Sequence, residues 1–306
     1  MIVHFDVDKT LNSLLQGEKH SIEITPKTLS RIKNKDKITV MSVKTASFIT
    51  KEVLEAFPKL KMLQTRTVGI DHIDLTSCKE RKIAVYHIPN YGPYNVAQHA
   101  IALMLTGARN IISANIDTHS GNFSYKNFLG ISMHGKNFGV IGTGKIGIEA
   151  IKIGKSLGMN ILAFDIFKNE NAAKQHGFSY TTLSKLLKES DVITLHIPST
   201  KETYHMLGEK EFKLIKNNAI LVNTARGDLI DIKALIQHAN KFHSICLDVV
   251  EGELTFNKKH PLLKLKNCII TPHSAFYTDD SMKIIAKETE ENIKRFQKGD
   301  RTNRVV

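Results

Sequence analysis

The sequence predicts an α/β protein built from two doubly wound parallel-sheet domains. Short apolar, β-branched runs alternate with amphipathic stretches along the whole chain, which is the pattern of βαβ units. The chain has 306 residues, which exceeds one ordinary domain of roughly 100–200 residues. A glycine-rich junction between a strand and a helix opens a second series of strands near the middle of the chain. Together these observations predict two sheets, each with its own core.

The first series of strands predicts a small domain. Alternating apolar runs bounded by turn residues indicate strands at residues 2–7, 38–43, 61–65 and 83–88, separated by helices at residues 26–33, 51–57 and 74–81. The segment from Pro89 to Pro93 has the composition of a turn. A long connecting helix is expected after it, at residues 95–117.

The second series predicts a larger domain. Its strands are expected at residues 137–141, 160–164, 191–197, 219–223, 244–248 and 268–271. A last helix at residues 281–298 has one apolar face and ends at Gly299, a natural C-terminal cap. We expect this helix to pack back on the first domain, so that residues 94–275 are inserted between residues 1–93 and 276–306.

Composition and charge exclude several classes of protein. With 42% hydrophobic and 24% charged residues the chain is typical of a globular protein. Its net charge is +13, but the basic residues are scattered, which argues against a nucleic-acid partner and favours attraction of an anionic substrate. No apolar run of ~18 residues and no secretory pattern occur, so no membrane span and a cytoplasmic location are expected. The three cysteines lie far apart, and neither a disulfide framework nor a metal site is predicted.

The glycine-rich junction predicts a dinucleotide site. An apolar strand leads into Gly142-x-Gly144-x-x-Gly147, and a helix follows. Gly142 permits the tight turn, Gly144 lets the backbone approach a pyrophosphate, and Gly147 lets helix and strand pack closely, while the helix N-terminus attracts the phosphate charge. The alternative is that these glycines only mark a strand-to-helix turn.

Asp165 predicts which dinucleotide is bound. It ends the next strand, about 20 residues after the motif, where a carboxylate accepts hydrogen bonds from the adenosine ribose hydroxyls. The same carboxylate repels a 2′-phosphate, so we predict NAD over NADP. The nearby Lys168 could make this preference less than absolute.

Three ionisable residues, each shortly after an expected strand, predict a catalytic group. Arg226 follows the segment AILVNTA, Glu253 follows LDVVEG, and His273 follows IITP. Open α/β sheets place their functional loops at the carboxyl ends of the strands. Each residue by itself could be an ordinary surface charge or loop residue, and only their common placement singles them out.

These three side chains suit hydride transfer to a keto acid. The planar guanidinium of Arg226 fits a carboxylate and polarises a carbonyl. His273 can supply a proton near neutral pH. Glu253 would orient the imidazole and favour its protonated form.

The segments NTARG, LDVVEGE and TPHSAFYT resemble the signatures of the D-isomer-specific 2-hydroxyacid dehydrogenase family, closest to its D-lactate dehydrogenase branch. The resemblance covers most of the chain and is weakest over the first fifty or so residues. It implies a Rossmann NAD-binding domain inserted into a smaller flavodoxin-like substrate domain. It also implies a homodimer that reduces a small 2-keto acid, best pyruvate, to the D-2-hydroxy acid, with Arg226, Glu253 and His273 in the roles above.

The resemblance implies further site residues. The segments TRTVGIDHID and NYGP imply that the backbone amides of Val68 and Gly69 bind the substrate carboxylate beside Tyr91, and Phe276 resembles the aromatic wall of the lactate branch. The cofactor contacts implied in this way are Lys145 and Ile146 at the pyrophosphate, Ile197, Pro198 and Thr203 along the adenosine side, Thr224 and Ala225 near the nicotinamide ribose, and Asp248 at the carboxamide. Arg226 is also expected to contact the cofactor.

Other functions are compatible with parts of the sequence. The N-terminal Asp6-x-Asp8 resembles the motif of haloacid-dehalogenase-type phosphatases, with Asp6 as nucleophile, although Asp279 and Asp280 open a helix instead of forming the distal acidic pair of that family. A non-catalytic NAD-sensing corepressor could use the same fold. Within the enzyme class, formate dehydrogenases use glutamine where this chain has Glu253, whereas glyoxylate, hydroxypyruvate and 2-hydroxyisocaproate chemistries stay open.

Overall fold

The chain folds into two compact units. The computed structural model describes residues 1–306, apart from the side chain of Leu254. Unit 1 comprises Met1–Gly92 and Tyr277–Val306, and unit 2 comprises Pro93–Phe276. From the sequence, the two boundaries are expected after residues 93 and 275. Each unit contains one all-parallel sheet with helices packed on it, which confirms the predicted fold class.

Unit 1 is built on a five-stranded sheet with the order β2-β1-β3-β4-β5. Its strands are β1 (Ile2–His4), β2 (Glu18–Lys19), β3 (Val40–Val43), β4 (Met62–Thr65) and β5 (Ala84–Tyr86). Its helices are α1 (Lys9–Leu14), α2 (Lys51–Glu55), α3 (Leu75–Glu80) and α11 (Asp279–Lys298). The core is formed by apolar side chains of the central strands, such as Val3, Met41 and Leu63, which are fully buried.

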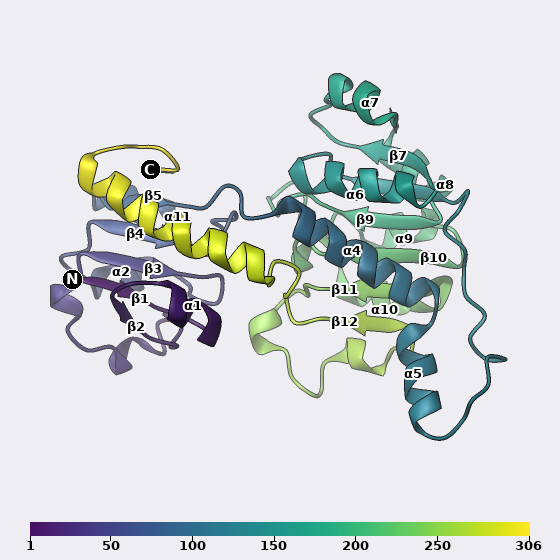
Figure 1. The fold of residues 1–306 in the computed structure, drawn as a ribbon, viewed down its shortest axis with the longest axis horizontal. Helices are drawn as coiled ribbons and strands as arrows, with labels where there is room; N and C mark the ends of the chain where they lie inside the picture. The colour runs from purple at the N-terminus through teal and green to yellow at the C-terminus, as the bar shows by residue number, and fades with distance from the viewer. The chain divides into compact units, whose positions relative to one another are not determined.

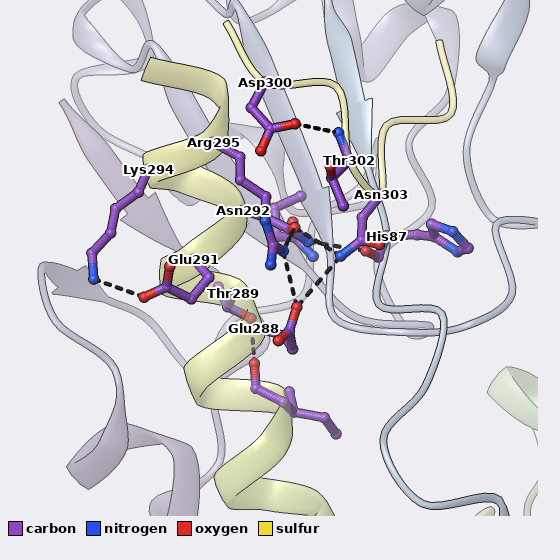
Figure 2. A network of polar contacts seen from close by, with 12 residues as sticks. His87, Glu288, Thr289, Glu291, Asn292, Lys294, Arg295, Asp300, Thr302 and Asn303 are labelled. Atoms are coloured by element: carbon purple, nitrogen blue, oxygen red, sulfur yellow. Dashed lines mark hydrogen bonds and ion pairs between the residues drawn. The ribbon is translucent and has the colours of Figure 1, made fainter. Parts of the chain in front are cut away.

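Helix α11 returns the chain to unit 1, as the sequence predicts. The Thr278 side chain caps its N-terminus, and Gly299 ends it in the left-handed conformation with a φ of 74°. Figure 2 shows a polar network along α11, in which Arg295 donates hydrogen bonds to Glu288 and Asn292. The buried amide of Asn292 donates to the Gln64 side chain and to the His87 carbonyl, each at 3.0 Å. Helix α11 is thereby joined to β4 and to the segment after β5.

Unit 2 has a seven-stranded sheet with the order β12-β11-β10-β9-β6-β7-β8 (Figure 1). Its strands are β6 (Asn137–Ile141), β7 (Asn160–Phe164), β8 (Ser179–Tyr180), β9 (Val192–Leu195), β10 (Ala219–Asn223), β11 (Phe242–Leu247) and β12 (Cys268–Ile270). Its helices are α4 (Pro93–Ala108), α5 (Ile111–His119), α6 (Lys145–Ser156), α7 (Glu170–His176), α8 (Leu183–Glu189), α9 (Glu209–Leu214) and α10 (Ile232–His238). The strand order reverses between β6 and β9, which creates the switch point at which doubly wound sheets bind ligands.

Two helix predictions are wrong in detail. Residues 26–33 form only a short 3-10 helix, Leu29–Arg31. The Thr28 hydroxyl donates to the Glu23 carbonyl and accepts from the Thr25 amide, and such local side-chain bonds compete with a helical backbone. The connecting helix expected at residues 95–117 is two helices, because Asn110 between α4 and α5 has a φ of 52° and interrupts the helical path. In the described part of the chain, no helix is long and apolar enough to cross a membrane.

Candidate active site

The junction between β6 and α6 has the geometry that a dinucleotide requires. Gly142 has a φ of 96°, and a Cβ there would lie 2.5 Å from the His196 carbonyl oxygen, at the end of the neighbouring β9. A Cβ on Gly147 would lie 1.9 Å from the Gly142 carbonyl oxygen. Both positions therefore exclude any side chain, as the sequence argument requires of a tight turn and a close helix-to-strand contact.

Gly144 differs from the other two glycines because the space beside it is open. A Cβ at this position would meet no atom within 4 Å, and the residue is the N-cap of the twelve-residue α6. Its φ of −68° is accessible to any residue, so the fold itself does not require glycine here. An exposed backbone at the positive end of a helix, with no acidic residue in the first turn, fits the pyrophosphate of NAD.

Asp165 lies directly after β7 and faces the same junction. Its Oδ2 accepts hydrogen bonds from the Thr143 amide at 2.7 Å and the Thr143 hydroxyl at 3.0 Å. Its Oδ1 accepts from the Phe167 amide at 2.9 Å. The carboxylate is thus fixed beside the glycine motif, and Oδ1 keeps capacity to accept a hydrogen bond from a ribose hydroxyl.

The other residues expected on the cofactor side follow the ends of strands in unit 2. Lys145 and Ile146 open α6, whereas Ile197, Pro198 and Thr203 follow β9, where the Thr203 hydroxyl donates to the Pro198 carbonyl. Thr224 and Ala225 follow β10. The Thr224 hydroxyl oxygen is buried without a hydrogen-bond partner among the described residues, which fits a position where a bound molecule completes the polar contacts.

His273 and Glu253 are brought together by the fold of unit 2. The His273 Nδ1 lies 2.9 Å from the Glu253 Oε1, and both side chains are partly exposed. Since a carboxylate only accepts, Nδ1 carries the proton of this bond, and the bond does not involve Nε2. The Phe276 ring stands edge-on to the imidazole, with the ring centroids 6.5 Å apart.

Asp248 organises the segment that carries His273. It is 1% exposed, and it accepts hydrogen bonds from the Thr271 hydroxyl at 2.6 Å and from the Ser274 and Ala275 amides at 2.9 Å. Burial alone would raise the pKa of Asp248, but these bonds and the neighbouring His99 outweigh it and lower the pKa. Both carboxylate oxygens of Asp248 accept hydrogen bonds from the segment of residues 271–275. In the structure, Asp248 therefore supports the loop that carries His273.

Arg226 lies at the end of β10, just before a short 3-10 helix. Its backbone carbonyl accepts a hydrogen bond from the Asn223 side chain at 2.7 Å, and its guanidinium donates to the Ala225 carbonyl at 2.8 Å. The side chain is partly buried. These contacts fix the backbone of the loop and place a permanently charged fork at the carboxyl edge of the sheet.

Unit 1 holds the residues Val68, Gly69 and Tyr91, which are expected on the substrate side, on loops after its strands. The carbonyls of Val68 and Gly69 are engaged by the His87 imidazole at 3.0 Å and the Thr67 hydroxyl at 2.5 Å. The Tyr91 carbonyl accepts from the Ser281 hydroxyl at 2.7 Å. With the Val68 and Gly69 carbonyls bound within unit 1, the loop has a defined backbone conformation for presenting its amides.

Three of the four aspartates considered for the phosphatase alternative have other positions in unit 1, whereas Asp6 Oδ2 is buried with no hydrogen-bond partner among the described residues. Asp8 caps α1 by accepting a hydrogen bond from the Leu11 amide at 2.9 Å. Asp279 and Asp280 lie in the first turn of α11, as the sequence analysis expects. These positions give no support to a phosphoryl-transfer site.

A comparison with protein-family models decides the family. The model for the NAD binding domain of D-isomer specific 2-hydroxyacid dehydrogenases matches residues 101–275, which is more than half of the chain. The chain belongs to the D-isomer specific 2-hydroxyacid dehydrogenase family. The family resemblance seen in the sequence is thereby confirmed, and NAD is the cofactor of this dehydrogenase-family chain.

Known relatives of this family place the chain among several substrate specificities. It is 39% identical over 267 residues to D-lactate dehydrogenase of Escherichia coli, covering 82% of this chain and 81% of that protein. It is 36% identical over 307 residues to D-3-phosphoglycerate dehydrogenase of Methanocaldococcus jannaschii, covering 99% of this chain but only 58% of that longer protein. Other relatives are named glyoxylate reductase and hydroxypyruvate reductase.

A solved structure of the family extends the likeness to the whole chain. D-lactate dehydrogenase of Aquifex aeolicus, complexed with NAD and lactic acid, superposes with a TM-score of 0.89 at 36% sequence identity. The superposition covers 100% of this chain and 99% of that one.

Some residues of the site have no signal in the sequence. Thr143 occupies the first unspecified position (x) of the glycine motif, yet it donates hydrogen bonds to Asp165 through both its amide and its hydroxyl. Tyr180 lies on the two-residue strand β8, too short to be expected from periodicity, and His99 lies on α4, far from Asp248 in the chain. Only the three-dimensional fold brings these residues to the residues named above.

Proposed function

We propose that this chain is an NAD-dependent dehydrogenase that reduces a small 2-keto acid to its D-2-hydroxy acid, with pyruvate as the first candidate. The observation that carries the proposal is the 2.9 Å contact between His273 Nδ1 and Glu253 Oε1, in the unit whose β6–α6 junction fits NAD. In this proposal unit 2 is the cofactor domain and unit 1 the substrate domain.

The chemistry divides between the cofactor and three side chains. NAD in its reduced form supplies the hydride. His273 gives the proton at Nε2 to the carbonyl oxygen as that oxygen becomes an alkoxide, and Glu253 holds the imidazole at Nδ1. Arg226 binds the carboxylate and polarises the carbonyl through its fork of N–H donors.

Substrate recognition is assigned to residues of both units. The amides of Val68 and Gly69 and the side chain of Tyr91 are proposed for the carboxylate, and Phe276 for the wall against the substrate side chain. Pyruvate is the first candidate because Phe276, whose ring stands edge-on to His273, resembles the aromatic wall of the lactate branch. Glyoxylate, hydroxypyruvate and 2-ketoisocaproate are the alternatives within the same reaction.

We also propose that the enzyme is a homodimer. Figure 1 shows α5 and the loop after it extending from the sheet of unit 2. Large apolar side chains on this arm are exposed, including Ile116 at 64%, Phe123 at 95% and Leu129 at 89%. Large apolar side chains exposed on one arm are typical of an interface, and a second copy of the chain would cover them.

A panel of 2-keto acids tests the proposed reaction. Purified protein is mixed with NADH and, in separate assays, with pyruvate, 2-ketoisocaproate, phenylpyruvate, oxaloacetate or hydroxypyruvate, and the loss of nicotinamide absorbance is followed. We expect turnover with at least one, fastest with pyruvate. Absence of turnover across the panel, in protein shown to bind NADH, would contradict the enzyme and favour a non-catalytic NAD sensor.

A further inference from the structure

Asp165 is held within unit 2 by hydrogen bonds on two sides. These bonds and the backbone of residues 167–169 together form a closed hydrogen-bond ring. On one side its Oδ2 accepts from Thr143, whose hydroxyl oxygen lies 2.8 Å from the hydroxyl of Tyr180. The Tyr180 hydroxyl in turn accepts from the Asn169 amide at 3.0 Å. On the other side, Oδ1 accepts from the Phe167 amide, which belongs to the same turn as Asn169. The Tyr180 hydroxyl is therefore the point at which both supports of Asp165 meet.

The number of protons fixes the direction of every bond in this ring. The single hydroxyl proton of Thr143 is donated to Asp165, so the Thr143 oxygen must accept from Tyr180. Tyr180 has one proton as well, and it accepts from the Asn169 amide with a lone pair. No hydroxyl in the ring can turn without leaving a polar group unpaired, and a chain of bonds aligned in one direction strengthens each member.

The surroundings of Tyr180 keep its hydroxyl in place. Its ring packs edge-on against Phe178, with the centroids 5.3 Å apart, and joins the core beneath the sheet. Asn169 caps α7 by accepting a hydrogen bond from the Ala172 amide, which anchors the far end of the turn. Thr143 is only 7% exposed. The hydrogen-bond ring around Asp165 is thus attached to the sheet, to α7 and to the glycine motif.

We infer that Tyr180, acting through Thr143, is a positioning residue that sets the preference of this protein for NAD over NADP. The inference rests on the proposed role of Asp165 at the adenosine ribose. A carboxylate discriminates between a hydroxyl and a phosphate only while it is held in place, because a mobile side chain can turn away from the 2′-phosphate and lose its contacts with the 2′-hydroxyl.

The test measures the dissociation constants of NADH and NADPH by nicotinamide fluorescence, without substrate and without turnover. Tyr180→Phe keeps the aromatic ring of the side chain but removes its hydroxyl. Thr143→Val keeps the amide and the shape but removes the hydroxyl, and Thr143→Ser restores it. We expect Tyr180→Phe and Thr143→Val to weaken NADH binding roughly three- to tenfold, the size of one hydrogen bond, and to leave NADPH binding unchanged or improved. Thr143→Ser should keep the wild-type ratio of the NADPH dissociation constant to the NADH dissociation constant.

Two further variants separate this inference from the role of Asp165 itself. Asp165→Ala should lower the NADH preference more than Tyr180→Phe, and adding Tyr180→Phe to Asp165→Ala should change the ratio no further. Thr76→Val, which removes a hydroxyl from an exposed residue of unit 1, is the matched control for Thr143→Val. If Asp165→Ala leaves the ratio unchanged, the role proposed for Asp165 fails.

The inference about Tyr180 is overturned by a different pattern. If Asp165→Ala lowers the ratio but Tyr180→Phe and Thr143→Val do not, Asp165 acts without the ring. A parallel loss of affinity for NADH and NADPH in Tyr180→Phe also overturns it, because such a loss reports general damage to the cofactor domain.

Discussion

His273 has a left-handed backbone conformation, with a φ of 50°. Such a conformation costs about 1–3 kcal/mol for a residue other than glycine and persists only where the surroundings impose it. Here the His273 amide donates to the Asp248 carbonyl at 2.7 Å, while the Asp248 carboxylate binds the next two amides. The strain therefore has an identified support, and it aims the imidazole at Glu253.

Arg226 offers the sharpest test at the scale of a residue. Arg226→Ala should lower kcat/KM roughly 100-fold or more, with a fall in kcat, since it removes donors that act on the developing charge. Arg226→Lys should recover little, because lysine keeps the charge but loses the planar fork. Steady-state kinetics of keto-acid reduction measure both variants, with the exposed Arg301→Ala as control. A raised KM with unchanged kcat would show that Arg226 only binds substrate.

At the residue level, the sequence predicts the functional side chains that follow strands. It does not predict the hydrogen bonds from other residues that hold those side chains in place. The sequence predicts Arg226, Glu253 and His273 as site residues because each lies soon after a strand, where functional loops gather. Asp248 was expected at the carboxamide of NAD on family resemblance. Its bonds to Thr271, Ser274 and Ala275 involve residues more than twenty positions away, and no local pattern indicates them.

The β6–α6 junction makes a prediction at the scale of an element. Gly144→Ala should leave the thermal unfolding midpoint unchanged, since its Cβ meets no atom of the chain, but should weaken NADH binding at least tenfold if the pyrophosphate approaches this backbone. Gly147→Ala places a Cβ 1.9 Å from a carbonyl oxygen and should cost about 1–3 kcal/mol of stability. Calorimetry and fluorescence titration measure the two effects. Wild-type NADH affinity in Gly144→Ala would refute the assignment of the pyrophosphate.

The elements that were predicted well are those with a strong apolar period. Strands β6, β7 and β10 have the bounds expected from the sequence, because buried parallel strands are continuous apolar runs between polar turns. Short edge strands such as β8 carry too few residues to show a period. The break at Asn110 was missed because the residues on both sides continue the helical pattern.

At the scale of the molecule, the exposed arm of unit 2 predicts the state of assembly. Light scattering coupled to size exclusion should give twice the chain mass of 34.3 kDa. Ile116→Asp combined with Leu129→Asp should shift the protein toward the single-chain mass, since both side chains lie on the proposed interface. The exposed Leu263→Asp in another part of unit 2 should not. A wild-type protein that elutes as one chain would contradict the dimer.

The central claim is that the chain makes a D-2-hydroxy acid by hydride transfer from NADH, with His273 as the proton donor. It is tested most directly by chiral analysis of the product formed from pyruvate and NADH. We expect D-lactate as the single enantiomer, and a loss of its formation by roughly 100-fold or more in His273→Ala. Formation of L-lactate or a racemate, or equal rates in wild type and His273→Ala, would contradict the account.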